Sequence, residues 1–336
     1  MTKINIFSGF LGAGKTTLIQ KLIKDGFTDK IVLIENEFGE IAIDGGFMQE
    51  AGVEIKEINS GCICCSLVGD FEASLKEVIE KYAPERIIIE PSGVGKLSDV
   101  KEAVLKVCNA DVVLEGSIAV VHAKKCKMYA RNYGEFFIDQ IQHADCIVLS
   151  RSQDATESKL AETIGIIKQY NQNASLVTTP WDDISGTEIL EAFRKSELLT
   201  VDEVACGCGG HGHHHHDEEG ECCGGHGHHH HEHEHHHHHD HHHADDVFTS
   251  YGEETTKKYT KEQLEGILQE LPNSDEYGMI LRAKGIVQAS DNSWLHFNYV
   301  PGEASVTTGA ASYTGRFCVI GSKLHTESLK ELFLGE

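Results

Sequence analysis

The residues best suited to chemistry form a glycine-rich loop that joins an apolar segment to a helical one. Gly9, Gly14, Lys15 and Thr16 match the P-loop pattern G-x-x-x-x-G-K-[ST], and an apolar run over residues 3–7 precedes them. Glycines let backbone N–H groups surround phosphate oxygens, and the following helix directs the positive end of its dipole at the same anion. The alternative is a glycine-rich turn that matches the pattern by chance, but such a turn would not need a strand before it and a helix after it. The pattern therefore predicts a nucleoside-triphosphate site.

Three residues are expected to carry the chemistry at that site. Lys15 would reach the β- and γ-phosphates, and the Thr16 hydroxyl would bind Mg²⁺. Glu90 ends an apolar strand expected over residues 86–89, and an acidic strand end suits the Mg²⁺ shell of a P-loop enzyme. We therefore expect Mg²⁺ as a cofactor, held by Thr16 and Glu90. The residues expected to contact the nucleotide are Gly9, Gly12, Ala13, Gly14, Lys15, Thr16, Thr17, Ser150 and Arg151.

The segment expected to recognise the base follows a strand over residues 146–149. P-loop GTPases recognise guanine there with Asn-Lys-x-Asp, whereas this chain has Ser150-Arg151-Ser152-Gln153. Arg151 can stack over the base where Lys usually does, but Gln153 takes the position of the carboxylate that accepts the guanine N–H groups. Asp154 follows one residue late. We expect GTP as the substrate, and ATP stays open as an alternative.

A group of thiols follows an alternating segment that is expected to form a strand. Cys62, Cys64 and Cys65 place three thiols within four residues, which core packing does not explain because neighbouring side chains cannot all face inward. Thiolates are soft ligands that favour Zn²⁺ and other late divalent transition metals. Three of them leave one tetrahedral position for a carboxylate, a water or a ligand from a client protein, and Glu37 is the candidate for it. A redox pair and an incidental cluster are the alternatives.

A histidine-rich tract interrupts the chain. Residues 206–243 hold 19 of the 23 histidines and almost nothing apolar, so the tract is expected to be a disordered linker. Neutral imidazoles bind Zn²⁺, Ni²⁺, Co²⁺ and Cu²⁺ with little discrimination, which favours a loose metal reservoir over a spacer without a role. An engineered tag would be terminal and uninterrupted. The residues expected to bind these secondary ions are Cys206, Cys208, Cys222, Cys223, His213, His214, His228 and His235.

Composition limits the partners and the compartment. The formal net charge of −24 argues against nucleic acid as a partner, and no apolar run approaches the roughly 20 residues of a membrane span. The first residues are expected to form a strand, so a secretory signal is not expected. The cysteines outside the two clusters are expected to be buried thiols, so a reducing, cytoplasmic setting is expected. These scattered residues are Cys108, Cys126, Cys146 and Cys318.

The order of the expected elements indicates an α/β protein. Strands and helices alternate through the first half, which is typical of a P-loop domain with a mostly parallel sheet covered on both faces. We expect this domain over residues 1–200, the linker over 201–256, and a small α+β C-terminal domain over 257–336. A domain of roughly 80 residues can fold alone.

These features together resemble the CobW-like GTP-binding metallochaperones, which are relatives of the hydrogenase and urease nickel-insertion GTPases. The resemblance covers nearly the whole chain, and the Cys-x-Cys-Cys motif with the strand-end Glu distinguishes it. It rests on these segments: Gly9–Thr17, Glu35–Glu40, Gly61–Cys65, Ile89–Gly93, Gln140–Asp145, the histidine-rich linker and Leu281–Gly285. Two departures stand out, namely the altered base-recognition segment and His122, where the family commonly has Asp.

The resemblance implies slow GTP hydrolysis coupled to the loading or delivery of Zn²⁺, Co²⁺ or Ni²⁺ to a client metalloprotein, and a CobW-type C-terminal domain. Our leading hypothesis is therefore a nucleotide-gated metal carrier. One alternative is a metal-storage protein with a vestigial P-loop domain. Another is an ATP-dependent activase of a metallo- or corrinoid enzyme. The oligomeric state is left open, and a nucleotide- or metal-dependent dimer is among the options.

Overall fold

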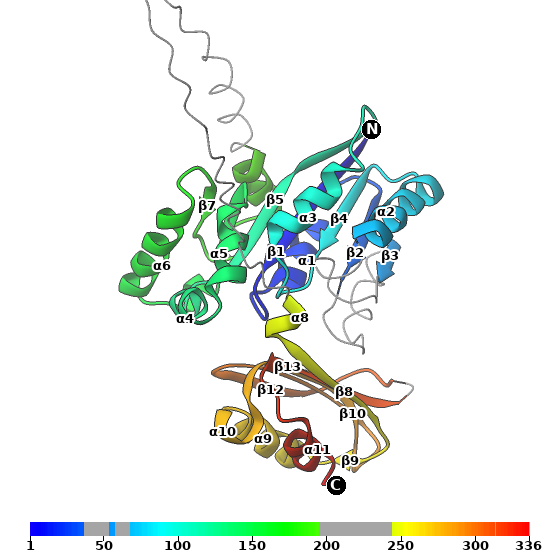
Figure 1. Cartoon of the computed structure of the whole chain (residues 1–336), viewed down its shortest axis with the longest axis vertical. Coiled ribbons are helices and arrows are strands. Elements are labelled where there is room, and N and C mark those ends of the chain that lie inside the picture. Colours follow the sequence, from blue (N-terminus) through cyan, green and yellow to red (C-terminus); the bar gives the residue numbers. More distant parts are fainter. Residues whose placement is uncertain (37–53, 58–67, 195–243, 313, 336) are drawn as a thin grey trace, which may run out of the picture.

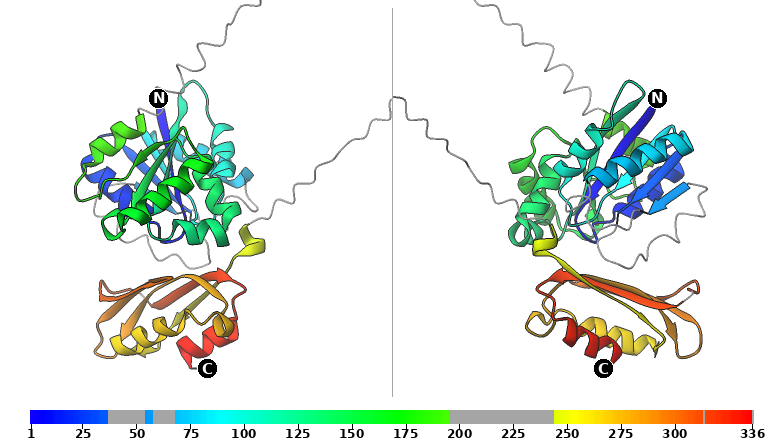
Figure 2. Two further views of the ribbon diagram at one scale, coloured as in Figure 1. Left: turned by 90° about the vertical axis from the view of Figure 1, so that its left-hand side faces the viewer. Right: turned by 45° about the vertical axis from the view of Figure 1, so that its right-hand side comes forward.

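The structure, a computed structural model, describes residues 1–36, 54–57, 68–194, 244–312 and 314–335. These residues form two units, an α/β unit up to residue 194 and a smaller α+β unit from residue 244 (Figure 1). The sheet of the smaller unit faces the larger unit, and the helices between residues 261 and 334 lie on its far side, whereas the short helix over residues 244–247 lies between the units (Figure 2).

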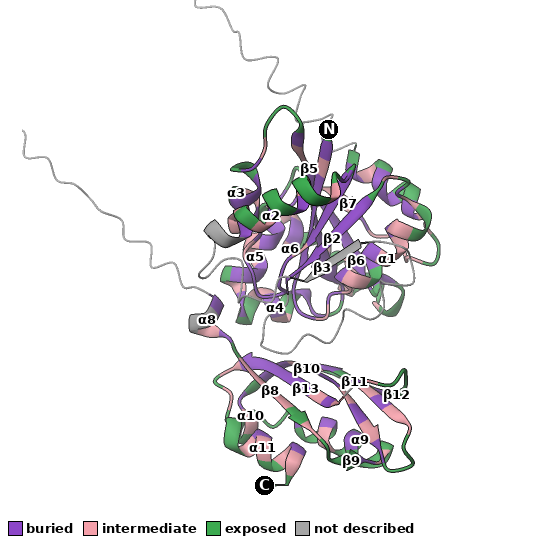
Figure 3. Ribbon diagram, turned by 90° about the vertical axis from the view of Figure 1, so that its right-hand side faces the viewer, coloured by how far each residue is buried: buried purple, intermediate pink, exposed green. Residues whose placement is uncertain are grey.

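Seven parallel strands form the sheet of the larger unit in the described part of the chain. In sheet order they are β3 (Glu54–Glu57), β2 (Ile31–Glu35), β4 (Arg86–Glu90), β1 (Thr2–Gly9), β5 (Val112–His122), β6 (Cys146–Ser150) and β7 (Ser175–Val177). The central strands are buried over most of their length because both faces of the sheet are covered (Figure 3). The predicted α/β fold with a mostly parallel sheet is confirmed.

Successive side chains of each strand enter two separate cores, one on each face of the sheet. On β4, Ile87 and Ile89 pack with Phe71 of α2, whereas Ile88 packs with Leu18 of α1. The helices are α1 (Lys15–Asp25), α2 (Val68–Tyr82), α3 (Leu97–Leu105), α4 (Cys126–Asn132), α5 (Gly134–Gln142), α6 (Glu157–Tyr170) and a helical segment over residues 186–194. None of the described helices has the length and apolar character needed to cross a membrane.

The smaller unit is a mainly antiparallel sheet with helices on one face. Its strands, in sheet order, are β12 (Glu303–Thr308), β11 (Trp294–Val300), β10 (Met279–Ala289), β13 (Gly315–Ser322) and β8 (Thr249–Thr255), and β9 (Lys258–Tyr259) pairs with β10. Its helices are α8 (Ala244–Val247), α9 (Lys261–Glu270), α10 (Ser274–Tyr277) and α11 (Thr326–Leu334). Leu268 of α9 and Phe333 of α11 pack on Phe317 and Val287, which closes the core of this unit.

The start of this unit differs from the predicted residue 257. Residues 249–255, which the sequence pattern assigns to the linker, form β8 and pair with β13. Their sequence is mostly polar, which an edge strand tolerates. β8 is held to β13 by backbone hydrogen bonds and not by buried apolar side chains.

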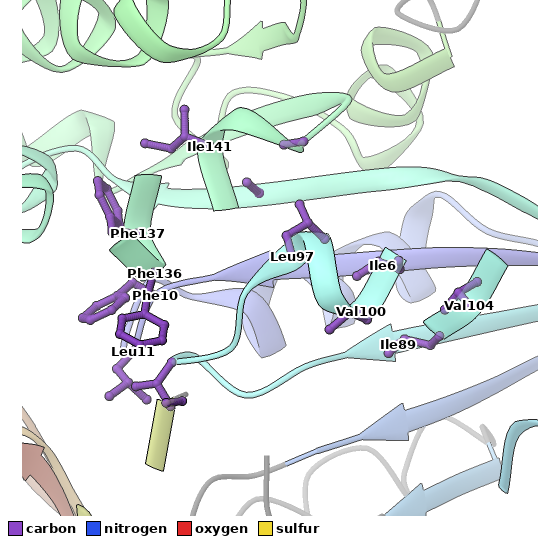
Figure 4. Packing of buried hydrophobic residues seen from close by; sticks show 14 of the residues in the cluster. Ile6, Phe10, Leu11, Ile89, Leu97, Val100, Val104, Phe136, Phe137 and Ile141 are labelled. Carbon is purple, nitrogen blue, oxygen red and sulfur yellow. The ribbon is translucent and has the colours of Figure 1, made fainter. Parts of the chain in front are cut away.

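The two units share one hydrophobic core at the tip of β1. Phe10 and Leu11 follow the strand and pack beside Phe136 and Phe137 of α5 (Figure 4). The ring of Phe248, from the smaller unit, lies 5.0 Å from that of Phe136 between centroids. From the smaller sheet, Leu281, Cys318 and Ile320 join this same core. The C-terminal sheet is therefore fixed by apolar packing directly beside the P-loop.

A buried ion cluster joins the strands at the opposite edge of the larger sheet. The Arg86 side chain is 1 % exposed, and it donates to Asp29 at 2.5 Å and to Asn5 and Glu115. Lys3 also contacts Glu115, at 2.8 Å. Burial would raise the pKa of the Glu115 carboxyl, but the hydrogen bonds and charges of Arg86 and Lys3 outweigh it and lower that pKa to about 2.

This cluster makes the free energy of unfolding depend on pH. Glu115→Gln should lower the free energy of unfolding by about 3 kcal/mol at neutral pH, because the folded pKa of about 2 lies below the ordinary value of 4.5. The stabilisation is complete above pH 4.5 and is lost as the pH falls through about 2. Urea titrations from pH 7 to pH 2 should therefore show the two proteins converging.

The matched control is Glu102→Gln. Its carboxylate is 73 % exposed in an ion pair with Lys106, so its loss should change the free energy of unfolding by less than ~1 kcal/mol. An equal effect of the two substitutions, or a Glu115→Gln effect that stays constant down to pH 2, would contradict the assigned role of the cluster.

Candidate nucleotide-binding site

The P-loop over residues 9–16 joins β1 to α1 through a tight backbone turn. β1 ends at Gly9, the Ala13 N–H donates to the Phe10 carbonyl at 3.1 Å, and α1 begins at Lys15. Gly12 and Gly14 have φ angles of 68° and 100°, in the left-handed region that favours glycine. The sequence therefore uses glycine where the loop must turn before the helix begins.

Lys15, Thr16 and Glu90 meet where β1 and β4 end. The Lys15 ammonium donates to the Gly9 carbonyl at 3.0 Å, and its side chain lies mostly within the protein. The Thr16 hydroxyl donates to both carboxylate oxygens of Glu90, at 3.0 and 3.2 Å. Because β1 and β4 are parallel neighbours, their carboxyl ends bring the helix start and the acidic strand end together.

Two cavities adjoin these three residues. The larger has a volume of about 390 Å³ and extends from the P-loop to Ser150 and Trp181. The smaller, of about 30 Å³, is bordered by Asn36, which follows β2. Lys15, Thr16 and Glu90 line both, so they mark the phosphate end of a site that could hold a nucleotide.

The C-terminal sheet forms one wall of both cavities. Arg282 of β10 lines each of them, and Asn298 of β11 lines the larger one. A Cβ atom placed on Gly12 would lie 2.5 Å from Cγ1 of Val300, so β11 is packed directly against the P-loop backbone. The site is thus built from both units.

At its other end the larger cavity is bordered by the loops that follow β6 and β7. Arg151 has a φ of 56°, and Gln153 lies in the helical turn over Ser152–Asp154 that follows it. Trp181 donates its indole N–H to the Leu149 carbonyl at 2.9 Å, and Asp182 follows it. An aromatic ring, a guanidinium, an amide and a carboxylate therefore gather where a base would lie.

Glu303 of β12 links this end to the C-terminal sheet. One of its carboxylate oxygens lies 3.1 Å from Nε2 of His122 and 3.2 Å from the Lys125 ammonium, and the other lies 3.4 Å from Arg151. The Lys124 N–H donates to Nδ1 of His122, which assigns the proton to Nε2 and makes His122 the donor to Glu303.

The pKa shifts agree with this arrangement. Burial and the nearby Lys125 charge lower the pKa of His122, so it stays neutral at pH 7. Burial would raise the pKa of the Glu303 carboxyl, but Lys125 and His122 outweigh it, and the pKa lies below its ordinary value. A carboxylate that accepts from His122 and pairs with the cations of Lys125 and Arg151 therefore links the base loop to the C-terminal sheet.

The structure brings most of the predicted nucleotide contacts to one cavity. Those that line it are Gly12, Ala13, Gly14, Lys15, Thr16, Thr17, Ser150 and Arg151, and the expected Mg²⁺ ligand Glu90 lines it as well. Gly9 lies behind the loop, where its carbonyl binds Lys15. Trp181, Asp182, Arg282 and Asn298 were not predicted. The first two follow β7, whose carboxyl end lies at the same sheet edge as those of β1 and β4, and their segment carries no motif that would mark them.

The ligands predicted for the transition-metal ions, unlike the Mg²⁺ ligands Thr16 and Glu90, lie outside the described residues. They are Glu37, Cys62, Cys64, Cys65, Cys206, Cys208, Cys222, Cys223, His213, His214, His228 and His235. Within the described ranges, no three His, Cys, Asp or Glu side chains converge in a way that would hold a metal ion.

The scattered cysteines are mostly buried, as predicted. Cys126, Cys146 and Cys318 are buried and Cys108 is half-buried. Burial raises the pKa of the Cys126 and Cys146 thiols to about 12, so they remain protonated at neutral pH.

Comparison with known families assigns both units. The family described as CobW/HypB/UreG, nucleotide-binding domain, matches residues 3–178, which is more than half of the chain. The family described as Cobalamin synthesis protein cobW C-terminal domain matches residues 248–335.

Individual relatives match part of the chain. The zinc chaperones YeiR and YjiA of Escherichia coli are 33 % and 31 % identical, over 46 % and 54 % of this chain. The matches span only about half the length of these relatives, 48 % and 58 %. Zinc-regulated GTPase metalloprotein activator 1 of Schizosaccharomyces pombe is 23 % identical over 88 % of this chain and 74 % of its own length. Zn(II)-bound YjiA GTPase from E. coli aligns over 99 % of this chain and 98 % of its own, with 19 % identity and a TM-score of 0.45.

The contact between Val300 and Gly12 can be tested by stability. Gly12→Ala should lower the free energy of unfolding by about 1–3 kcal/mol more than Gly302→Ala. Both glycines have left-handed φ angles, but a Cβ on Gly302 would meet nothing within 4 Å. Adding Val300→Ala to Gly12→Ala should recover the excess, because it removes the clashing methyl groups. Urea unfolding of the single and double variants measures this coupling, and strictly additive effects would contradict the packing.

Proposed function

Because this chain belongs to the CobW/HypB/UreG family of nucleotide-binding proteins, we propose that it hydrolyses GTP to load or deliver a divalent transition metal. The cargo is Zn²⁺, Co²⁺ or Ni²⁺, and the recipient is a client metalloprotein. The names of the relatives, zinc chaperones and a GTPase metalloprotein activator, support this proposal.

One observation supports it above the others, namely the meeting of Lys15, Thr16 and Glu90 beside a cavity that both units line. In a protein that only stored metal, the P-loop would not need a lysine, nor a hydroxyl within hydrogen-bonding distance of an acidic strand end. Asn36 also borders the smaller cavity, and the segment with Glu37 begins at the next residue. A nucleotide bound here would therefore touch the start of that segment.

The donors at this point fit Mg²⁺. The Thr16 hydroxyl and the Glu90 carboxylate are hard oxygen ligands, and they lie 3.0 Å apart at the end of the P-loop. When bound, Mg²⁺ supplies positive charge to the β- and γ-phosphates. Thr16 and Glu90 would hold it, with Glu90 acting directly or through a water.

The other cations of the site act on the phosphates. Lys15 would exchange the Gly9 carbonyl for a phosphate oxygen, and the P-loop N–H groups would bind the remaining oxygens. Arg282 approaches from the C-terminal sheet and would add a planar, bidentate donor to the same charge. Loss of the γ-phosphate on hydrolysis would then change contacts made by both units.

The cargo is assigned to the thiolates of Cys62, Cys64 and Cys65, with Glu37 as the fourth ligand. β2 and β3 both end at the sheet edge that bears the P-loop, and the segments with these ligands follow those strands. The histidine-rich tract over residues 206–243 is assigned a secondary, weakly selective metal-binding role.

The carrier hypothesis is tested by metal analysis of a chain that lacks residues 206–243. Cys64→Ala should remove about one zinc ion per chain, because three thiolates and one further ligand make one tetrahedral site. GDP binding should persist. Cys108→Ala removes a half-buried thiol elsewhere and should leave the zinc content unchanged. An unchanged zinc content in Cys64→Ala would place the cargo site elsewhere.

The chain that lacks residues 206–243 also distinguishes the metal-carrier hypothesis from the metal-storage hypothesis. Zinc affinity at the thiolates should differ between the nucleotide-free, GDP-bound and GTP-bound states. Equal affinities in all three, with GTP turnover no faster than that of Lys15→Ala, would favour a storage protein with a vestigial P-loop.

Arg282 can be tested by its effect on turnover. Arg282→Ala should lower kcat for GTP hydrolysis by about 100-fold, since it removes a donor aimed at the charge that develops on the phosphates. Arg282→Lys should recover part of the loss. Lys261→Ala on α9 removes one positive charge from the far side of the sheet and should not change kcat. A kcat for Arg282→Ala equal to that of the unaltered chain would rule out a role at the phosphates.

A further inference from the structure

The end of the larger cavity that lies away from the phosphates has the shape and chemistry of a base pocket. Trp181 is fixed by its hydrogen bond to the Leu149 carbonyl, and a Cβ on Gly14 would lie 3.3 Å from its ring. The ring is therefore packed beside the start of α1. Arg151 lines the same space, and its guanidinium offers a second flat surface for stacking.

The usual guanine-binding carboxylate is absent from the loop after β6, where the chain has Gln153. Asp154 does not replace it. Its side chain does not line the cavity, and its carboxylate lies 3.9 Å from Arg151. The loop after β6 therefore supplies an amide to the cavity and no carboxylate.

Two acidic side chains line the larger cavity among the described residues, Glu90 and Asp182. Glu90 bonds to Thr16 at the phosphate end. Asp182 lies at the other end, in the loop after β7, next to Trp181. It is an exposed residue that lines the cavity.

We infer that Asp182 is the carboxylate that selects guanine. The loop after β7 thus supplies the carboxylate that the loop after β6 lacks. The inference rests on the proposed use of a nucleoside triphosphate and names its base. Guanine presents N–H donors at N1 and N2 and an acceptor at O6. A carboxylate accepts from both donors, and the Gln153 amide can donate to O6. Adenine would face Asp182 with the lone pair of N1, which is repulsive.

A change of base specificity tests this role in the full-length chain. Asp182→Asn should weaken the binding of a fluorescent GDP by at least about tenfold, since one acceptor becomes an NH₂ group facing the guanine donors. The same variant should bind the xanthosine diphosphate analogue at least about tenfold more tightly than the unaltered chain does. Xanthine has an oxygen at C2, which accepts from the new amide. A merely structural role of Asp182 would not produce this gain.

Two neighbouring carboxylates serve as matched controls. Asp183→Asn and Asp154→Asn change residues that do not line the cavity, so both should keep the preference for GDP over xanthosine diphosphate. Asp182 is exposed, and an unchanged melting temperature would show that its variant is folded.

The outcomes separate the inference from the proposed function. If the unaltered chain prefers GDP to ADP and Asp182→Asn keeps that preference, the role of Asp182 is overturned and the GTP proposal stands. A switch to xanthine in Asp154→Asn instead would also overturn it. If the unaltered chain binds ADP as tightly as GDP, the assignment of GTP falls, and the base-selecting role of Asp182 falls with it.

Discussion

The nucleotide cavity depends on the packing of the C-terminal sheet against the carboxyl edge of a parallel sheet. At that edge the strands end in polar groups, Glu90 among them, which need a partner or water. The C-terminal sheet covers the edge through an apolar contact around Leu11 and Ile320, and Val300 lies directly over Gly12. Where the two surfaces do not touch, they leave the space that Lys15 and Arg282 border. Loss of this packing would therefore remove a wall of the site as well as stability.

Charge explains why three cations gather here in a strongly acidic chain. The protein has a net charge of −24, and a bound triphosphate adds further negative charge. Lys15, Arg151 and Arg282 come from three different elements and line the same cavity, so they offset this repulsion locally. Glu90 is the exception at the phosphate end, and its position beside the Thr16 hydroxyl suits a cation-binding role rather than a contact with phosphate.

A feature could be predicted from the sequence where neighbouring residues determine it, and could not where packing between distant segments determines it. The P-loop and Glu90 were predictable because a strand end fixes the position of the next few residues. Trp181 and Asp182 obey the same rule, but their segment contains no motif that reveals its role. Arg282 was not predictable as a site residue, because its place beside Lys15 depends on how two units pack. β8 was missed because backbone pairing, and not apolar periodicity, holds an edge strand.

The two departures from the family pattern meet at one contact. His122 takes the place of a common Asp, and the altered base loop contains Arg151; both side chains bind Glu303. An Asp at position 122 would put a second carboxylate beside Glu303, and the like charges would repel each other. A neutral His instead donates a hydrogen bond to one carboxylate oxygen of Glu303, and the other oxygen pairs with Arg151 at the cavity. Glu303 therefore joins both departures to the C-terminal sheet.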